Sequence, residues 1–166
     1  MKYITILFLA VSLKAAQVEG FVGFAPNSPM VFGDAPVKGL SLVGVDVSLG
    51  KKTFEYVTSA QYLTLPGSHS RNFGITPLGV RFNFFFGDRL IHPFLLADAG
   101  IIASTRPIPV PRPNATGLNF LVDFGAGVKI GRASVGYKLL HISNAETTNF
   151  NPGLDANVFF VSYRIH

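Results

Sequence analysis

Apolar and polar residues alternate along most of this chain with a period of two, which is the pattern of a β-strand with one apolar and one polar face. Within residues 40–49, Val43, Val45 and Val47 fall on one face and Asp46 falls on the other. Segments of this kind, separated by clusters of Gly, Pro, Asn and Asp, are predicted to be strands. The eight predicted strands cover residues 18–26, 40–49, 53–63, 73–86, 92–104, 118–130, 133–143 and 154–165.

The charged residues within these segments share the face opposite the apolar one. A soluble β-sandwich places its apolar side chains inside and its charges outside. A Lys or Arg on the lipid side of a membrane strand costs about 2–4 kcal/mol near the middle of the bilayer. The pattern therefore predicts an apolar outer surface and an interior ion-pair network, in preference to an acid–base centre or a channel lining. The inward residues are Asp46, Glu55, Arg81, Asp98, Asp123, Lys129, Lys138 and Arg164.

The connections between the predicted strands alternate in length. The short ones are residues 50–52, 86–91 and 131–132, and the longer ones are residues 27–39, 64–72, 105–117 and 144–153. Outer-membrane barrels have an even number of strands, short periplasmic turns and longer extracellular loops. We therefore predict an all-β fold, namely an eight-stranded antiparallel transmembrane β-barrel with short periplasmic turns and longer extracellular loops.

Composition agrees with a barrel and excludes several other classes. Hydrophobic residues make up 48% of the chain and charged residues 14%, against about 25% charged in an ordinary soluble domain. The apolar residues are nevertheless not gathered into the run of about 18 that a membrane helix needs. The absence of cysteine excludes disulfides, a thiol nucleophile and a lipid-anchored cysteine. The four histidines, His69, His92, His141 and His166, lack paired ligand spacing, so we expect no metal and no cofactor.

The first residues have the layout of a secretory signal. Lys2 is followed by the apolar stretch 4–13 and by small residues up to Ala16. We expect a signal peptide over residues 1–16, cleaved after Ala16 or nearer Gly20, and a single outer-membrane barrel domain over residues 17–166. A first strand or a buried helix is the alternative interpretation. The net charge of the chain is only +5, and loss of the leader lowers it. Because the charge is small and no recognition motif is present in the sequence, nucleic acid is not an expected partner.

The separation into an apolar face and a polar face fails where the seventh and eighth segments meet the loop between them. On the seventh segment the apolar face leads to His141 and then to Ser143, and on the eighth it leads back to Asn157 and then to Asp155. All four polar residues lie at one end of a single hairpin. The topology places that end in the outer leaflet.

Three of these residues can form a catalytic relay. Residues two apart on a strand lie about 6.6 Å apart on one face, so His141 can reach Ser143. If Asp155 is the cross-strand partner of His141, it can hold the imidazole. Ser143 would then be the nucleophile, His141 its base and Asp155 the orienting acid. Polar residues at a strand end near the membrane interface are also common in barrels without a catalytic role, which is the alternative.

The sequence around these residues resembles a known family. The run His141-Ile142-Ser143-Asn144-Ala145, followed by Asn151-Pro152-Gly153-Leu154-Asp155, is similar to the signature of the outer-membrane lipid A 3-O-deacylase (PagL) family, also called acyloxyacyl hydrolase-like. The resemblance implies that His141 is the base, Ser143 the nucleophile, Asp155 the acid and Asn151 part of the oxyanion site. From the residues themselves we also expect Asn144 and Gly153 to have oxyanion or positioning roles, since backbone N–H groups of residues 144–153 can stabilise an oxyanion and Gly153 permits close backbone approach. The founding members use Glu as the acid, and Asp155 is one methylene shorter.

The resemblance implies a serine carboxylic-ester hydrolase in the bacterial outer membrane. Its expected activity is removal of an ester-linked 3-hydroxyacyl chain from the 3-position of lipid A, with lipopolysaccharide as the substrate. The residues alone indicate only an acyl ester near a membrane surface. Alternatives are a non-enzymatic small barrel for envelope integrity or adhesion, and an enzyme that transfers the acyl chain to another acceptor. A homodimer is compatible with each of these.

Basic residues cluster in the predicted outer loops. Arg106 and Arg112 border a proline-rich stretch that is stiff and extended, and Arg71 lies in the neighbouring loop. These three arginines are candidates for binding the phosphates of lipopolysaccharide. A loop that is merely solvated is the alternative.

Overall fold

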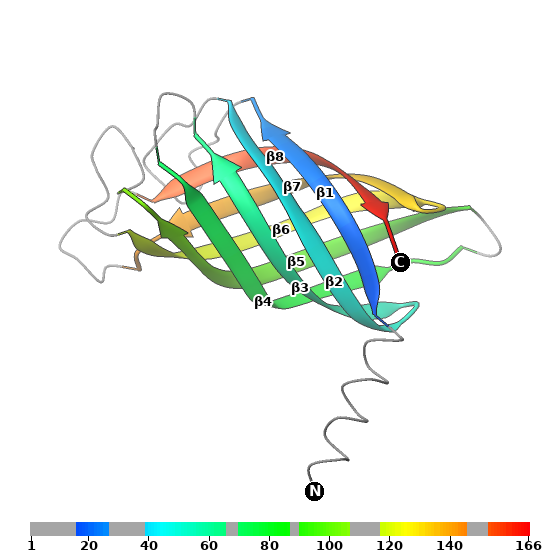
Figure 1. Ribbon diagram of the computed structural model, residues 1–166. Helices are drawn as coiled ribbons and strands as arrows, with labels where there is room; N and C mark the ends of the chain where they lie inside the picture. Colours follow the sequence, from blue (N-terminus) through cyan, green and yellow to red (C-terminus); the bar gives the residue numbers. More distant parts are fainter. Residues whose placement is uncertain (1–15, 27–38, 66–69, 87–89, 107–116, 146–152) are drawn as a thin grey trace, which may run out of the picture.

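The chain folds into a closed barrel of eight antiparallel strands in sequence order, with β1 hydrogen-bonded to β8 (Figure 1). The computed structural model describes residues 16–26, 39–65, 70–86, 90–106, 117–145 and 153–166. The strands are β1 (Gln17–Ala25), β2 (Leu40–Lys51), β3 (Phe54–Thr64), β4 (Asn72–Asn83), β5 (Ile91–Ser104), β6 (Leu118–Ile130), β7 (Ala133–Ser143) and β8 (Leu154–Arg164). The predicted fold class is confirmed. The predicted signal peptide lies outside the described residues except for Ala16.

The start of β1 lies beside the end of the chain. The backbone N–H of Val18 donates to the carbonyl of His166 over 3.1 Å. Both therefore lie at one end of the barrel, and the end of β7 and the start of β8 lie at the other (Figure 1). No helix within the described ranges is long and apolar enough to cross a membrane.

The outer surface of the barrel is apolar, as the alternation predicts. Large hydrophobic side chains of every strand are exposed there; Phe159 is 57% exposed and Val161 51%. Their neighbours in sequence point inward, so Phe160 is only 8% exposed. An isolated soluble domain rarely exposes so extensive an apolar surface. Such a surface is more stable in an apolar environment than in water.

Strand β4 departs from simple alternation. Phe73 and Ile75 point outward, but Arg81, which has the same parity in sequence, is buried inside. The register of β4 against both neighbours shifts between Ile75 and Gly79, where Pro77 and Leu78 are both exposed. A bulge of this kind adds a residue to one strand and switches its faces, and proline is tolerated there because it has no N–H to pair.

The Pro77 carbonyl on the bulge keeps hydrogen-bond partners. It accepts from the hydroxyl of Tyr56 and, at 3.5 Å, from the hydroxyl of Thr58. The predicted inward position of Arg81 is confirmed, although the bulge was not predicted. The bulge is what lets Arg81 reach the interior.

Arg81 is the centre of an ion-pair network inside the barrel. Its guanidinium lies 3.2 Å from Glu19, 3.1 Å from Asp46 and 3.4 Å from Glu55. Lys129 adds contacts of 3.6 Å to Glu19 and 3.5 Å to Glu55. Burial of these charges is tolerated because each carboxylate faces a cation. The predicted inward network is present, and Glu19, which the sequence analysis did not include, is part of it.

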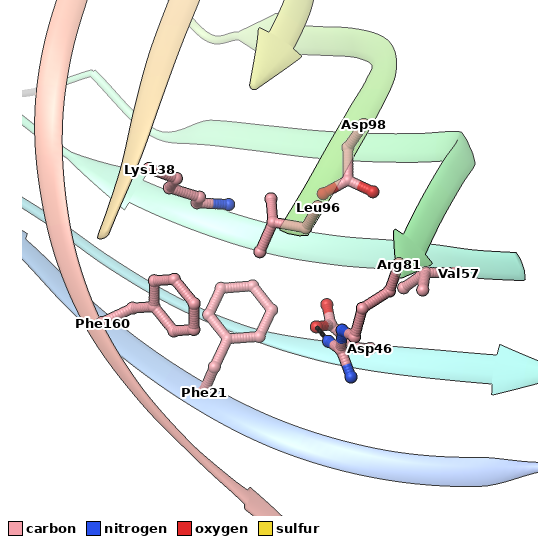
Figure 2. Close-up of a pocket in the computed structure, with 8 residues that line it drawn as sticks. All are labelled: Phe21, Asp46, Val57, Arg81, Leu96, Asp98, Lys138 and Phe160. Carbon is pink, nitrogen blue, oxygen red and sulfur yellow. Dashed lines mark hydrogen bonds and ion pairs between the residues drawn. The ribbon is translucent and has the colours of Figure 1, made fainter. Parts of the chain in front are cut away.

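A second ion pair lies further along the interior. The Lys138 ammonium is 2.7 Å from the Asp123 carboxylate, and Asp98 is the cross-strand partner of Asp123. A cavity of about 20 Å³ separates this region from Arg81, with Phe21 and Phe160 on its apolar side (Figure 2). Such a space holds about one water molecule. The side chains of the described strands fill the barrel around it, as expected for eight strands.

Removal of the central cation should destabilise the barrel strongly. Arg81→Ala leaves Glu19, Asp46 and Glu55 facing one another, and loss of one partner of a buried ion pair costs about 3–5 kcal/mol. We expect a loss of that size in the free energy of unfolding, measured by urea titration in detergent micelles. The exposed Arg71 provides the control, because Arg71→Ala should change stability by less than about 0.5 kcal/mol. Equal effects of the two substitutions would contradict this account of the core.

Candidate active site

His141 and Asp155 form a hydrogen-bonded pair on the outward face of the barrel. They are cross-strand partners on β7 and β8, and His141 Nδ1 lies 2.7 Å from Asp155 Oδ1. The Asp155 side chain is fully buried and that of His141 is 21% exposed. The carboxylate is therefore held away from solvent, while part of the imidazole remains accessible.

Ser143 lies at the end of β7, two residues beyond His141 and on the same outward face. It is half-buried, and its partner across the ladder on β6 is Phe120. Because Nδ1 of His141 bonds to Asp155, a serine hydroxyl would have to bond to the other ring nitrogen, Nε2. The arrangement brings the three predicted catalytic residues onto one face at one end of the β7–β8 hairpin.

The chain turns sharply at both ends of this hairpin loop. Asn144 follows Ser143 and is 1% exposed, and Ala145 after it has a φ of +50°. Gly153, directly before β8, has a φ of +35°, a conformation that glycine adopts without steric cost. Both of these predicted positioning residues, Asn144 and Gly153, thus flank the pair. Asn151 lies outside the described residues.

A second polar pair lies next to the first on the outer surface. The Tyr137 hydroxyl donates to Asn157 Oδ1, and the Tyr137 ring packs against Phe159 with centroids 5.4 Å apart. Asn157 is two residues from Asp155 on the same face of β8, a spacing of about 6.6 Å. The alternation in the sequence places Asn157 on the apolar face, but it predicts no role for this residue.

An apolar groove of about 670 Å³ runs along the outside of the barrel below these pairs. It crosses β1, β6, β7 and β8, and its walls include Val22, Phe24, Tyr137 and Phe159. Tyr137 and Phe159 are cross-strand partners, so the groove begins at the Tyr137 ring. From the strand end inward, the surface presents the His141–Asp155 pair, then Asn157, and then this groove.

A family model for lipid A 3-O-deacylase (PagL) matches residues 44–164, which include both polar pairs. The chain belongs to the lipid A 3-O-deacylase (PagL) family. The match spans β2 to β8 almost entirely, so it covers the barrel as well as the residues around His141. No curated protein matches the chain.

Solved structures show the same fold as this PagL-family chain. The crystal structure of the outer membrane enzyme PagL matches with a TM-score of 0.72 and 21% identity, covering 89% of this chain and 99% of that one. Neisserial surface protein A matches with a TM-score of 0.61 and 8% identity, covering 91% and 97%. The N-terminal β-barrel domain of Pseudomonas aeruginosa OprF gives 0.54 and 13%, covering 90% and 97%.

Two of the three rim arginines lie within the described part of this PagL-family barrel. Arg71 and Arg106 are exposed next to β4 and β5, and the backbone N–H of Thr105 donates to the carbonyl of Arg71 over 3.0 Å. They therefore share one region of the rim. Arg112 lies outside the described residues. No group of three His, Cys, Asp or Glu side chains in the described ranges could hold a metal ion.

The hydrogen bond to Asp155 should fix the proton of His141 on Nδ1. We expect a strongly downfield ¹H resonance for this N–H in ¹⁵N-histidine-labelled protein in micelles, because a short bond to a carboxylate deshields the proton and slows its exchange. Asp155→Ala should abolish the resonance. His92, whose Nδ1 has no hydrogen-bond partner among the described residues, is the internal reference. A resonance that survives Asp155→Ala would show that the carboxylate does not hold the ring.

Proposed function

We propose that this chain is an outer-membrane lipid A 3-O-deacylase that hydrolyses an ester-linked 3-hydroxyacyl chain of lipopolysaccharide with a Ser143–His141–Asp155 triad. The observation that carries the proposal is the His141–Asp155 hydrogen bond, which lies on the outward face of an apolar barrel. A triad in a soluble esterase lies in a cleft. Here the candidate nucleophile is on the surface that membrane lipid would contact.

The same surface supports placement in the outer membrane. A barrel with an apolar exterior and with the start of β1 beside the end of β8 matches the architecture of outer-membrane proteins. With that end of the barrel in the periplasm, the end of β7 and the start of β8 would lie in the outer leaflet. Lipid esters lie at the boundary between acyl chains and headgroups, so lipid A would meet Ser143 without leaving the bilayer.

The proposed reaction is a two-step acyl transfer through a Ser143 acyl-enzyme. Ser143 Oγ attacks the ester carbonyl carbon while its proton passes to His141 Nε2, and the same proton then goes to the sugar oxygen as the ester bond breaks. A water molecule attacks the acyl-enzyme, again with His141 as base, and releases the fatty acid. Asp155 stays ionised and stabilises the imidazolium that forms in both steps.

The oxyanion of each tetrahedral intermediate needs hydrogen-bond donors. Asn151 and backbone N–H groups of residues 144–153 are the proposed donors, and loss of one such donor typically costs about 2.7–4 kcal/mol. Ala145 and Gly153, which border this loop, both have positive φ values, and Gly153 allows close approach of the backbone to a ligand. Arg71, Arg106 and Arg112 are proposed to bind the lipid A phosphates at the rim.

Ser143→Ala should abolish deacylation. Mass spectrometry of lipid A from cells that express the wild-type chain should show loss of one 3-hydroxyacyl group, and the variant should leave lipid A intact. Ser134→Ala is the matched control, because Ser134 is a buried serine on the opposite face of β7. Folding is checked by the shift in gel mobility between heated and unheated samples.

Three outcomes separate the proposal from its alternatives. Unmodified lipid A in cells with folded wild-type barrel would support a non-enzymatic barrel. Loss of the chain together with a mass gain on another lipid would indicate acyl transfer. Loss that persists in Ser143→Ala would remove the nucleophile from the mechanism.

The acid of the triad provides a second test. Asp155 already reaches His141 at 2.7 Å and is fully buried, so Asp155→Glu must fit an extra methylene into a packed site, which costs about 1–3 kcal/mol. We expect a lower kcat, by about 5- to 150-fold if that cost falls on the transition state. Asp155→Asn should lower kcat further, by about 10⁴-fold, because the amide favours the wrong imidazole tautomer. Higher activity in Asp155→Glu than in wild type would show that the native aspartate is too short.

A further inference from the structure

The Tyr137–Asn157 pair has no part in the mechanism above, although it lies on the same outward face. Both residues are on the apolar side of their strands, where a polar group gains nothing from the charged interior. Their mutual hydrogen bond satisfies one donor and one acceptor. A pair that served only to satisfy itself could be replaced by two apolar residues without loss.

The pair retains hydrogen-bonding capacity after that bond is made. A primary amide has two N–H donors and a carbonyl acceptor, and a phenol has one donor and an acceptor oxygen. With Tyr137 donating to Asn157 Oδ1, the Asn157 amide N–H and the Tyr137 oxygen remain for a ligand. The pair therefore offers a donor and an acceptor side by side. An alcohol, which both donates and accepts, matches this arrangement better than a carbonyl, which only accepts.

The position of Asn157 tells which part of a ligand would meet it. Asn157 is the cross-strand partner of Leu139, the position between His141 and Tyr137 on the outward face of β7. Each step along that face is about 6.6 Å. An acyl chain whose carbonyl is at the His141 end and whose tail enters the groove at Tyr137 passes Asn157 with its first few carbons.

We propose that Asn157 and Tyr137 form a recognition site for a hydroxyl group near the carbonyl end of the acyl chain, and that they set a preference for hydroxylated over unsubstituted acyl esters. This inference rests on the proposed function, since it takes Ser143 as the nucleophile. It assigns Asn157 and Tyr137 to specificity, with the Asn157 amide donating to the hydroxyl oxygen and the Tyr137 oxygen accepting its proton.

The test compares two esters of one alcohol, carrying 3-hydroxytetradecanoyl or tetradecanoyl chains, in detergent micelles with purified full-length protein. The readout is the ratio of kcat/KM for the hydroxylated ester to kcat/KM for the unsubstituted one. We expect a ratio of about ten or more for wild type, the factor that one net hydrogen bond of about 1.4 kcal/mol provides. Asn157→Leu and Tyr137→Phe should each bring the ratio close to one, through loss on the hydroxylated ester.

Tyr56→Phe is the matched control. Tyr56 is also an exposed tyrosine that donates to a single acceptor, but that acceptor is Pro77 on the opposite part of the sheet. This variant should keep the wild-type ratio. Tyr137→Phe removes only a hydroxyl, so it keeps the test valid if Asn157→Leu fails to fold.

The outcomes distinguish this inference from the proposed function. A wild-type ratio near one, or an unchanged ratio in both Asn157→Leu and Tyr137→Phe, would overturn the recognition site. Equal losses on both esters would assign the pair a structural role and would overturn it as well. Hydrolysis of both esters by Ser143→Ala at the wild-type rate would instead refute the proposed nucleophile.

Discussion

A strand in a closed barrel has no free edge and two unlike faces, and this constraint governs the whole molecule. Its backbone groups are paired on both sides, so only the side chains distinguish inside from outside. Charges inside must therefore pair with one another, and Arg81 does this for three carboxylates at once. The apolar side chains are left on the exterior. Any polar side chain on that exterior needs a partner on the exterior too.

The same constraint applies to the polar side chains of the candidate active site, which lie on the exterior. His141 and Asp155 lie among apolar neighbours and satisfy each other across the β7–β8 ladder. Tyr137 and Asn157 do likewise at the next positions. Both pairs lie on one hairpin, so the polar positions are concentrated near one end of the barrel. The groove that starts at Tyr137 extends the same surface away from that end.

The sequence predicted strand count, order and most face assignments correctly, because a period of two is a local property of each segment. It did not reveal the bulge in β4. Pro77 interrupts the ladder there and the faces reverse, so Phe73 points outward and Arg81 inward although they are an even number of residues apart. Glu19 was not identified as an inward charge, because its segment also carries Phe21 on the inward face, which obscures the alternation.

The sequence by itself determined the eight-stranded barrel and the outward parity of His141, Ser143 and Asp155, since alternation follows from strand geometry alone. Only the tertiary structure decided which residues meet. The pairing of His141 with Asp155 depends on the register of β7 against β8, and the convergence of three acids on Arg81 depends on closure of the sheet. Register and closure join residues far apart in the chain, and no periodicity within one segment encodes those distances.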